Sequence, residues 1–234
     1  MKNFFKTIFD FLTMDYLDGT EAYLNQTMQA ATLLSPGDSV WLETGYRNTR
    51  WNVAKIFTYC GTEYAALFAQ DADTTDLAFK VLSVKEIFAM LCRLSRNPLG
   101  EGALVVCPWV GVDESGDDLF IVRSLFYNSE ERLGCAVLQQ VPLPGLVRTL
   151  HSSDFRSVEP IPYNELDSPF AQYQSVTVKT KGGCYKAHYV GFLYNVEGEP
   201  MAIVDYAMDE SSAECRPPIL EVVHFDNVSD YQAC

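Results

Sequence analysis

The residues best suited to chemistry in this chain are its three histidines and seven cysteines. An imidazole can transfer protons near neutral pH, and a thiolate is a strong nucleophile. Cys184 and His188 are the closest such pair in the sequence, but four residues along a strand span about 13 Å, which is too far for contact. His151 and His224 occupy equivalent places in a repeat described below, which favours a shared structural role. We therefore predict no catalytic pair of thiol and imidazole.

Patterns that bind metals or phosphates are also missing from the sequence. The cysteines form no CxxC pair, and no histidine has the spacing that would complete a zinc site. The glycine pairs at 100/102 and 182/183 lack the pattern of a phosphate-binding loop. Adjacent carboxylates lie in polar loops, where nothing raises a pKa for general acid catalysis, at Asp117-Asp118, Glu130-Glu131 and Asp209-Glu210. We therefore expect neither an enzyme nor a bound metal or cofactor.

The distribution of charge narrows the choice of partners. The chain has 234 residues, of which 48% are hydrophobic, and a net charge of −14 at pH 7. Residues 99–165 and 166–234 each carry four basic against ten acidic side chains, a balance of −6 for each stretch, whereas residues 36–98 are neutral overall. Acidic surfaces repel a phosphate backbone and attract basic surfaces. We therefore expect no direct binding of nucleic acid and a protein partner with a basic surface.

The sequence indicates a protein of a reducing compartment without a membrane span. The seven cysteines are odd in number and scattered, which is typical of reduced thiols. No run reaches the roughly 18 apolar residues of a spanning helix. Acidic residues interrupt the apolar stretch at 2–12 too early for a signal peptide. We predict a cytoplasmic location.

Three stretches of the chain share one spacing of apolar residues: Trp51–Phe68, Phe120–Leu138 and His188–Tyr206. Their period is about 68 residues, and a fixed period indicates one supersecondary unit used repeatedly. Four strands are predicted in each copy. They are 39–42, 51–57, 64–68 and 78–82 in the first copy, 104–107, 119–126, 134–138 and 146–150 in the second, and 176–179, 188–193, 201–206 and 219–223 in the third.

Helical and extended segments separate these copies. Residues 2–13 and 20–34 show helical spacing, so residues 1–35 are predicted as an N-terminal helical segment that packs on the first copy or mediates self-association. Val84–Leu94 is predicted as a linker helix, and Pro160–Ser168 as an extended spacer. The three domains that follow are 36–98, 99–165 and 166–234.

Four or five short, bent strands in about 55 residues resemble the Src homology 3-like barrel, and the loop lengths are most similar to its Tudor-type branch. A sheet that closes on itself removes its own edges, which suits so short a β unit. The resemblance implies a mainly β fold with short helices, in which three tandem small barrels follow a helical N-terminal segment. It rests on strand order and apolar pattern, and it concerns the fold rather than the function.

The resemblance to Tudor-type barrels also implies an aromatic cage that attracts a cation. The candidates are Tyr46, Trp51 and Phe68 beside Asp71 in the first copy, and Tyr185 and Tyr206 beside Asp209 and Glu210 in the third. The second copy offers Trp109, but Gln139-Gln140 replaces the other aromatic residue. Its first loop adds Asp117 and Asp118 to the predicted partner-binding residues. Packing inside the barrels is the alternative role for the aromatic rings.

Three functions are consistent with these features. The first is a non-catalytic adaptor or inhibitor whose barrel loops bind a basic partner surface, with avidity from the tandem modules. The second is an acidic decoy that mimics nucleic acid and blocks a nucleic-acid-binding enzyme. The third is an enzyme with a site in a cleft between copies. A cleft with convergent His, Cys and carboxylate groups would favour the enzyme, and a broad acidic face would favour binding.

Overall fold

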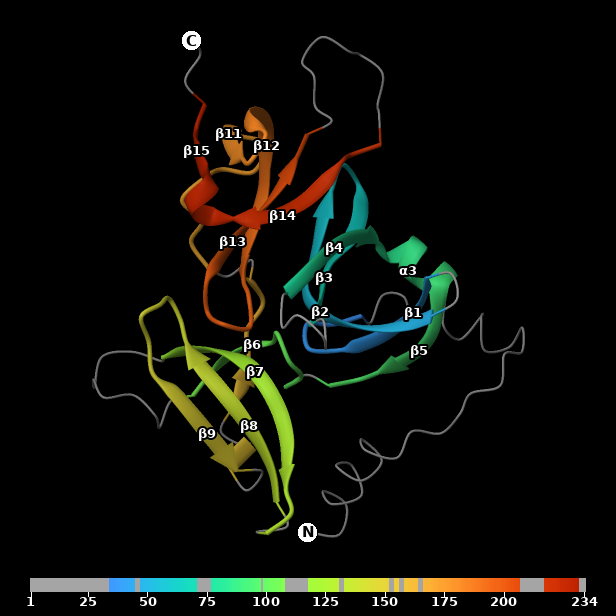
Figure 1. Cartoon of the computed structure of the whole chain (residues 1–234), viewed down its shortest axis with the longest axis vertical. Coiled ribbons are helices and arrows are strands. Elements are labelled where there is room, and N and C mark those ends of the chain that lie inside the picture. Colours follow the sequence, from blue (N-terminus) through green and yellow to red (C-terminus); the bar gives the residue numbers. More distant parts are fainter. Residues whose placement is uncertain are drawn as a thin grey trace.

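The protein is built mainly from antiparallel β-sheet, in three sheets of five strands each (Figure 1). A computed structural model describes residues 34–44, 47–70, 77–97, 99–107, 118–130, 133–151, 154–155, 158–163, 166–206 and 217–231. The helices predicted within residues 1–35 lie outside these ranges, except for Leu34 and Ser35. Leu34 is buried in the core of the first sheet. Within the described ranges, no helix has the length and hydropathy to cross a membrane.

The first sheet lies within residues 36–98, which we call repeat 1. Its elements are β1 (Ser39–Thr44), β2 (Arg47–Tyr59), β3 (Thr62–Gln70), β4 (Leu77–Ser83), the helix α3 (Val84–Met90) and β5 (Leu91–Ser95). Cys60 and Gly61 form the two-residue turn between β2 and β3, with φ angles of 47° and 73°. Positive φ at both positions matches the twist of a hairpin, and glycine adopts it without strain.

The second and third sheets repeat this plan. Repeat 2 (residues 99–165) contains β6 (Leu104–Val106), β7 (Leu119–Asn128), β8 (Leu133–Gln140), β9 (Val147–His151) and β10 (Glu159–Pro160). Repeat 3 (residues 166–234) contains β11 (Ser175–Thr180), β12 (Gly183–Tyr194), β13 (Pro200–Asp205), β14 (Leu220–His224), the short 3-10 helix η4 (Phe225–Asn227) and β15 (Val228–Asp230). Each strand predicted from the sequence overlaps one of these strands.

All three sheets have the same order of strands. In each sheet the first strand lies between the second and the fifth, and the second, third and fourth strands continue as an antiparallel meander. The second strand is irregular at the same place in every copy, between Val53 and Lys55, between Val122 and Ser124, and between Tyr189 and Gly191. A bulge of this kind inserts one residue and increases the local twist. The three stretches found in the sequence therefore fold as three copies of one β unit, each compatible with a small barrel.

The helix predicted over Val84–Leu94 is shorter than expected, and it is not a linker. Its start is fixed by a capping box, in which Ser83 Oγ accepts from Glu86 N at 3.2 Å and Glu86 Oε2 accepts from Ser83 N at 2.8 Å. The helix ends at Met90, and the chain continues as β5, which pairs with β1. Apolar periodicity alone misplaced this boundary, because pairing with a distant strand decides the conformation after Met90.

The extended spacer predicted over Pro160–Ser168 also belongs partly to the fold. Pro160 ends β10, which is the fifth strand of repeat 2 and pairs with β6. Tyr163 is buried, and its hydroxyl donates to the carbonyl oxygen of Tyr194 at 3.3 Å. Burial raises the pKa of Tyr163 well above its usual value. Through this hydrogen bond, the segment holds repeat 2 against repeat 3 and does not separate the two repeats.

Each sheet packs one side against a core of its own, and we call the opposite side its outer face. The three cores contain Trp51 and Leu67 in repeat 1, Phe120 and Leu138 in repeat 2, and Tyr189 and Val204 in repeat 3. A fourth, central cluster lies between the repeats. It combines outer-face residues of repeats 1 and 3, such as Phe68 and Ile203, with Leu104 and Ile121 of repeat 2 and with Tyr163.

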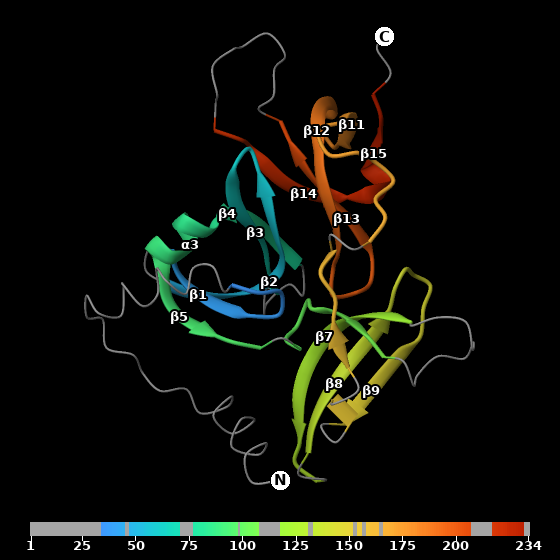
Figure 2. The ribbon, with the colours of Figure 1, turned by 180° about the vertical axis from the view of Figure 1, so that it is seen from behind.

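Repeats 1 and 3 are joined by buried polar contacts as well as apolar ones. Lys55 Nζ donates to the carbonyl oxygen of Phe192, and Tyr59 Oη donates to Asp205 Oδ2, each at 2.9 Å. Figures 1 and 2 both show β4 beside β14, with β7, β8 and β9 apart from this pair. Repeats 1 and 3 thus form a packed pair, and repeat 2 extends from it.

Candidate functional site

A pocket of about 580 Å³ opens where β4 of repeat 1 meets β13 and β14 of repeat 3. Its apolar wall comes from both repeats and consists of Leu77, Phe79, Met201, Val222 and Val223. Among the described residues, its polar lining comes from repeat 3 and consists of Lys179, Thr180, Asn195, Glu197, Glu199, His224 and Asn227. Because both repeats supply its walls, no single copy contains the complete site.

The carboxylates of the pocket are held by the hairpin between β12 and β13. Asn195 is buried at the start of this turn, and its Oδ1 accepts from the backbone nitrogens of Glu197 at 2.9 Å and Glu199 at 3.0 Å. Its Nδ2 donates to Glu199 Oε2 at 2.8 Å. Asparagine commonly organises turns in this way, because its short side chain reaches the backbone that follows it. One buried residue therefore fixes the geometry of two acidic residues.

His224 forms the second polar contact of the pocket. Its Nε2 lies 3.2 Å from Glu199 Oε2, and the two side chains are 43% and 36% exposed. A pair this exposed contributes about 0 to 1 kcal/mol to stability. An imidazole oriented by a carboxylate can transfer protons, but the described residues of the pocket lining include no thiol that the histidine could activate.

The charges and the apolar wall determine what the pocket can hold. Among the described lining residues, one ammonium, from Lys179, accompanies two carboxylates, from Glu197 and Glu199. These three charges leave this part of the cavity acidic on balance. An apolar wall beside acidic groups suits a ligand with an aliphatic stem and a positively charged end, which is the chemistry of lysine and arginine side chains.

The structure places the predicted partner-binding residues in different surroundings. Tyr185 on β12 is 49% exposed, and Tyr206 and Asp118 are half-buried. Burial, and then the nearby Glu221 carboxylate, raise the pKa of Tyr206. Trp51 is only 5% exposed, and Lys80 Nζ lies 4.9 Å from its ring centroid. The remaining predicted residues lie outside the described ranges, namely Tyr46, Asp71, Asp117, Asp209 and Glu210.

The aromatic residues proposed for a cage in repeat 1 do not come together. Trp51 packs in the core of repeat 1, whereas Phe68 is 3% exposed and packs in the central cluster on the outer face. The two rings therefore lie on opposite sides of the sheet. The cation that Trp51 meets is Lys80 of its own chain. In repeat 2, Gln139 is buried and donates to the carbonyl oxygen of Gly145 at 3.1 Å, which is a structural role.

The histidines also occupy surroundings that the sequence did not reveal. Cys184 is exposed, whereas His188 is buried, and its Nδ1 donates to the carbonyl oxygen of Tyr173 at 3.0 Å. The thiol and imidazole that do meet are Cys135 and His151, with Sγ and Nδ1 3.7 Å apart across β8 and β9. Cys135 is only 2% exposed, so substrate has no access to its thiol. Their contact could have been predicted from the sequence only by assigning the register of β8 against β9.

His151 and His224 hold equivalent positions, as the repeat indicated, because each is the last residue of the fourth strand. Their contacts differ, since His151 meets a thiol and His224 meets a carboxylate.

Across the described residues, no three His, Cys, Asp or Glu side chains are placed to hold a metal ion. The chain matches no known protein family, and no curated protein resembles it in sequence. The role of the pocket between repeats 1 and 3 therefore follows from its geometry alone.

Proposed function

We propose that the protein is a non-catalytic binding module that holds a basic side chain of a partner protein in the pocket between repeats 1 and 3. The proposal treats each five-stranded sheet as a small barrel of the Src homology 3-like type, in which loops present the working surface. The main support is the hairpin that holds Glu197 and Glu199 beside an apolar wall. A barrel fold alone would not carry a functional proposal.

The expected affinity of one side chain in this pocket is low. Burial of part of a four-carbon lysine stem yields roughly 0.8 kcal/mol for each methylene. An exposed carboxylate adds about 0 to 1 kcal/mol, and fixing the side chain costs about 0.5 to 1.5 kcal/mol. A single lysine would thus bind in the millimolar range or more weakly. The pocket selects the basic residue, and further contacts between the partner and the protein supply the affinity.

The test uses the full chain and an array of peptides that contain arginine or lysine. Binding affinities are measured by fluorescence anisotropy at low and high salt, and we expect binding that weakens as salt rises. The double variant Glu197→Gln/Glu199→Gln should lose at least tenfold in affinity. Glu63→Gln/Glu130→Gln is the matched control, because it removes two exposed carboxylates away from the pocket. Leu77→Lys should also abolish binding, because it places an ammonium in the cavity.

Two outcomes would contradict this function. Equal binding by the pocket variant and the control variant would show that the pocket is not the site. Failure of every basic peptide and of basic proteins to bind the wild-type chain would refute the function itself.

A catalytic role is the second candidate, because the pocket lies between two repeats and contains the pair of His224 and Glu199. Such a pair could act as a general base on a bound water. A panel of ester, amide and phosphoester substrates tests this role, and turnover that disappears in His224→Gln would support it. The decoy function depends on acidic loops at 111–117 and 207–216, which lie outside the described residues, so it stays a prediction.

A further inference from the structure

The outer faces of repeats 1 and 3 bury each other. Leu193 and Ile203 of repeat 3 are 0% exposed, and Phe68 of repeat 1 is 3% exposed. At the edge of this contact the fourth strands meet, and their outer-face residues pack against the central cluster: Leu77, Phe79 and Val81 of β4, and Leu220 and Val222 of β14. The buried outer faces of repeats 1 and 3 are thus covered by each other.

The outer face of repeat 2 is covered only at one end. Ile121 joins the central cluster, and the hairpin of repeat 3 approaches Gln139, since a Cβ on Gly198 would lie 2.8 Å from Gln139 Cγ. Away from this contact the outer face is open. Phe126, towards the other end of the sheet, is 45% exposed, and Val147, on the edge strand beside Gln139, is 54% exposed.

The register of the sheets shows which buried residues correspond to these exposed ones. Counted from the shared bulge, Phe126 corresponds to Leu193, which is fully buried. Val147 corresponds to Phe79 and Leu220, which pack in the central cluster. The same positions that form an interface in two repeats therefore face solvent in the third. Phe126 and Val147 lie on the same face at opposite ends of β8, and exposed apolar residues at positions that are buried in the equivalent repeats indicate a docking surface.

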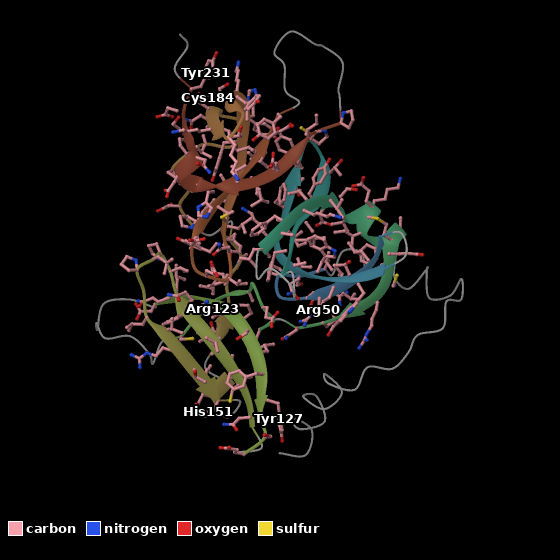
Figure 3. The ribbon with its side chains drawn as sticks, in the orientation of Figure 1. Arg50, Arg123, Tyr127, His151, Cys184 and Tyr231 are labelled. Atoms are coloured by element: carbon pink, nitrogen blue, oxygen red, sulfur yellow. The ribbon has the colours of Figure 1, made fainter. Side chains whose placement is uncertain are left out.

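The charge of this face differs from that of the whole chain. The protein carries a net charge of −14, yet the described outer-face residues of β7, β8 and β9 include no carboxylate. They are Leu119, Ile121, Ser124, Phe126, Asn128, Cys135, Val137, Gln139, Val147, Thr149 and His151. Glu159, on the short strand β10 opposite Val106, is an acidic residue of this face at the edge away from β9. Figure 3 shows His151 at one end of the sheet and Arg123, the bulge residue, towards the other. Two acidic chains could therefore approach closely along β7, β8 and β9 without bringing acidic residues of these strands together.

We infer that the outer face of repeat 2 binds the same face of a second copy, in a two-fold symmetric dimer. Three copies of one unit cannot all pair within a chain, and repeats 1 and 3 already cover each other. The remaining face has the same construction as the two that pair. A two-fold contact is self-complementary by symmetry, so it needs no partner of a different sequence. The edge strand β9 would meet its counterpart as β4 meets β14.

The first experiment measures the mass of the full chain by light scattering and sedimentation over a range of concentrations. We expect the mass to rise from 26.3 kDa towards twice that value. A contact made by one sheet face is small, so the expected dissociation constant is in the micromolar range. Val147→Asp and Phe126→Asp should each weaken the dimer at least tenfold. Tyr185→Asp and Ile219→Asp, which replace similarly exposed apolar residues in repeat 3, should leave it unchanged.

A second measurement avoids substitutions altogether. Amide hydrogen exchange of the wild-type chain at low and high concentration should show added protection in β7, β8 and β9 as the dimer forms. A chain that stays at 26.3 kDa at all concentrations would overturn the inference. So would a dimer that survives both aspartate variants without added protection in these strands, because its contact would then lie elsewhere, for example in residues 1–33. Capture of a different protein by this face from a monomeric chain would overturn it as well.

Discussion

Substitution of Lys55 tests how a buried charge affects the contact between repeats 1 and 3. Lys55 lies at the contact between repeats 1 and 3, only 8% exposed, and within the described part of the chain its hydrogen bond goes to the carbonyl oxygen of Phe192 in repeat 3. The rings of Tyr163 and Phe192 lie 5.8 and 5.9 Å from Nζ. No carboxylate of the described residues pairs with it. We therefore expect the charge of Lys55 to destabilise the fold, and Lys55→Met to stabilise it.

The magnitude follows from the pKa of Lys55. Burial lowers this pKa from 10.5 to about 8. Each pKa unit corresponds to about 1.4 kcal/mol, so the buried charge costs roughly 3 kcal/mol at neutral pH. Methionine keeps most of the stem and carries no charge, but it forfeits the hydrogen bond from the charged amine to Phe192, worth about 2 kcal/mol. Lys55→Met should therefore raise the free energy of unfolding by about 1 kcal/mol at pH 7.

The advantage of the variant should disappear at alkaline pH. Between pH 8 and 10.5 the unfolded chain holds the proton of Lys55 while the folded chain releases it, so wild-type stability gains from this group as pH rises. Below pH 8 both states are protonated, and the penalty is present in full. The buried thiol of Cys107, with its pKa raised to about 11, acts in the opposite direction above pH 9. The comparison must therefore be between variant and wild type at each pH, because Cys107 is common to both.

Urea unfolding at pH 7, 8, 9 and 10, followed by circular dichroism, measures this difference. The matched control is Lys85→Met, which removes a lysine from the exposed side of α3. We expect about 1 kcal/mol of added stability for Lys55→Met at pH 7 and close to none at pH 10, with the control within about 0.5 kcal/mol of wild type throughout. If Lys55→Met destabilises the protein at pH 7, or if its effect does not change with pH, the charge of Lys55 stabilises the repeat contact and our reasoning fails.

Three further substitutions test individual contacts by the same unfolding assay. Tyr59→Phe removes the buried hydroxyl that donates to Asp205 at 2.9 Å and should cost about 2 kcal/mol, because bonds to charged groups are the stronger ones; an effect below about 0.5 kcal/mol would contradict this. Ser83→Ala removes the capping box of α3 and should cost about 1 kcal/mol, with no change in the contact between repeats. Gly191→Ala places a Cβ 3.0 Å from Lys55 Nζ, so it should cost about 1 kcal/mol in the wild type and clearly less in Lys55→Met; equal costs in a double-mutant cycle would exclude this clash.

The strands could be predicted because their signal is local. Alternating apolar residues and a polar turn within about 18 residues are enough to indicate a hairpin, and the same pattern three times indicates the repeat. The end of α3 could not be predicted in this way. Residues after Met90 form β5 because β1, some 50 residues earlier, offers a free edge, and nothing near Met90 encodes that pairing.

The candidate site could not be predicted from the sequence, because its residues come from two repeats. Leu77 and Glu199 are far apart in the chain, and only the packing of β4 against β14 brings them to one pocket. The same packing buries Lys55, whose position in a strand of apolar residues gave no sign of its contact with repeat 3. The pairing of Cys135 with His151 depends on the register of one hairpin, and a slip of one residue would place them on opposite sides.

The pairing of β10 with β6 has a consequence for how this architecture can change. Because the first and last strands of repeat 2 are neighbours, with Pro160 opposite Val105, the chain enters and leaves this unit at almost the same point. The pair formed by repeats 1 and 3 is held by its own contacts. Repeat 2 is thus a cassette inserted into a two-part scaffold. We expect that another domain with adjacent termini can be grafted in its place, giving the scaffold a new specificity while its own pocket stays in place.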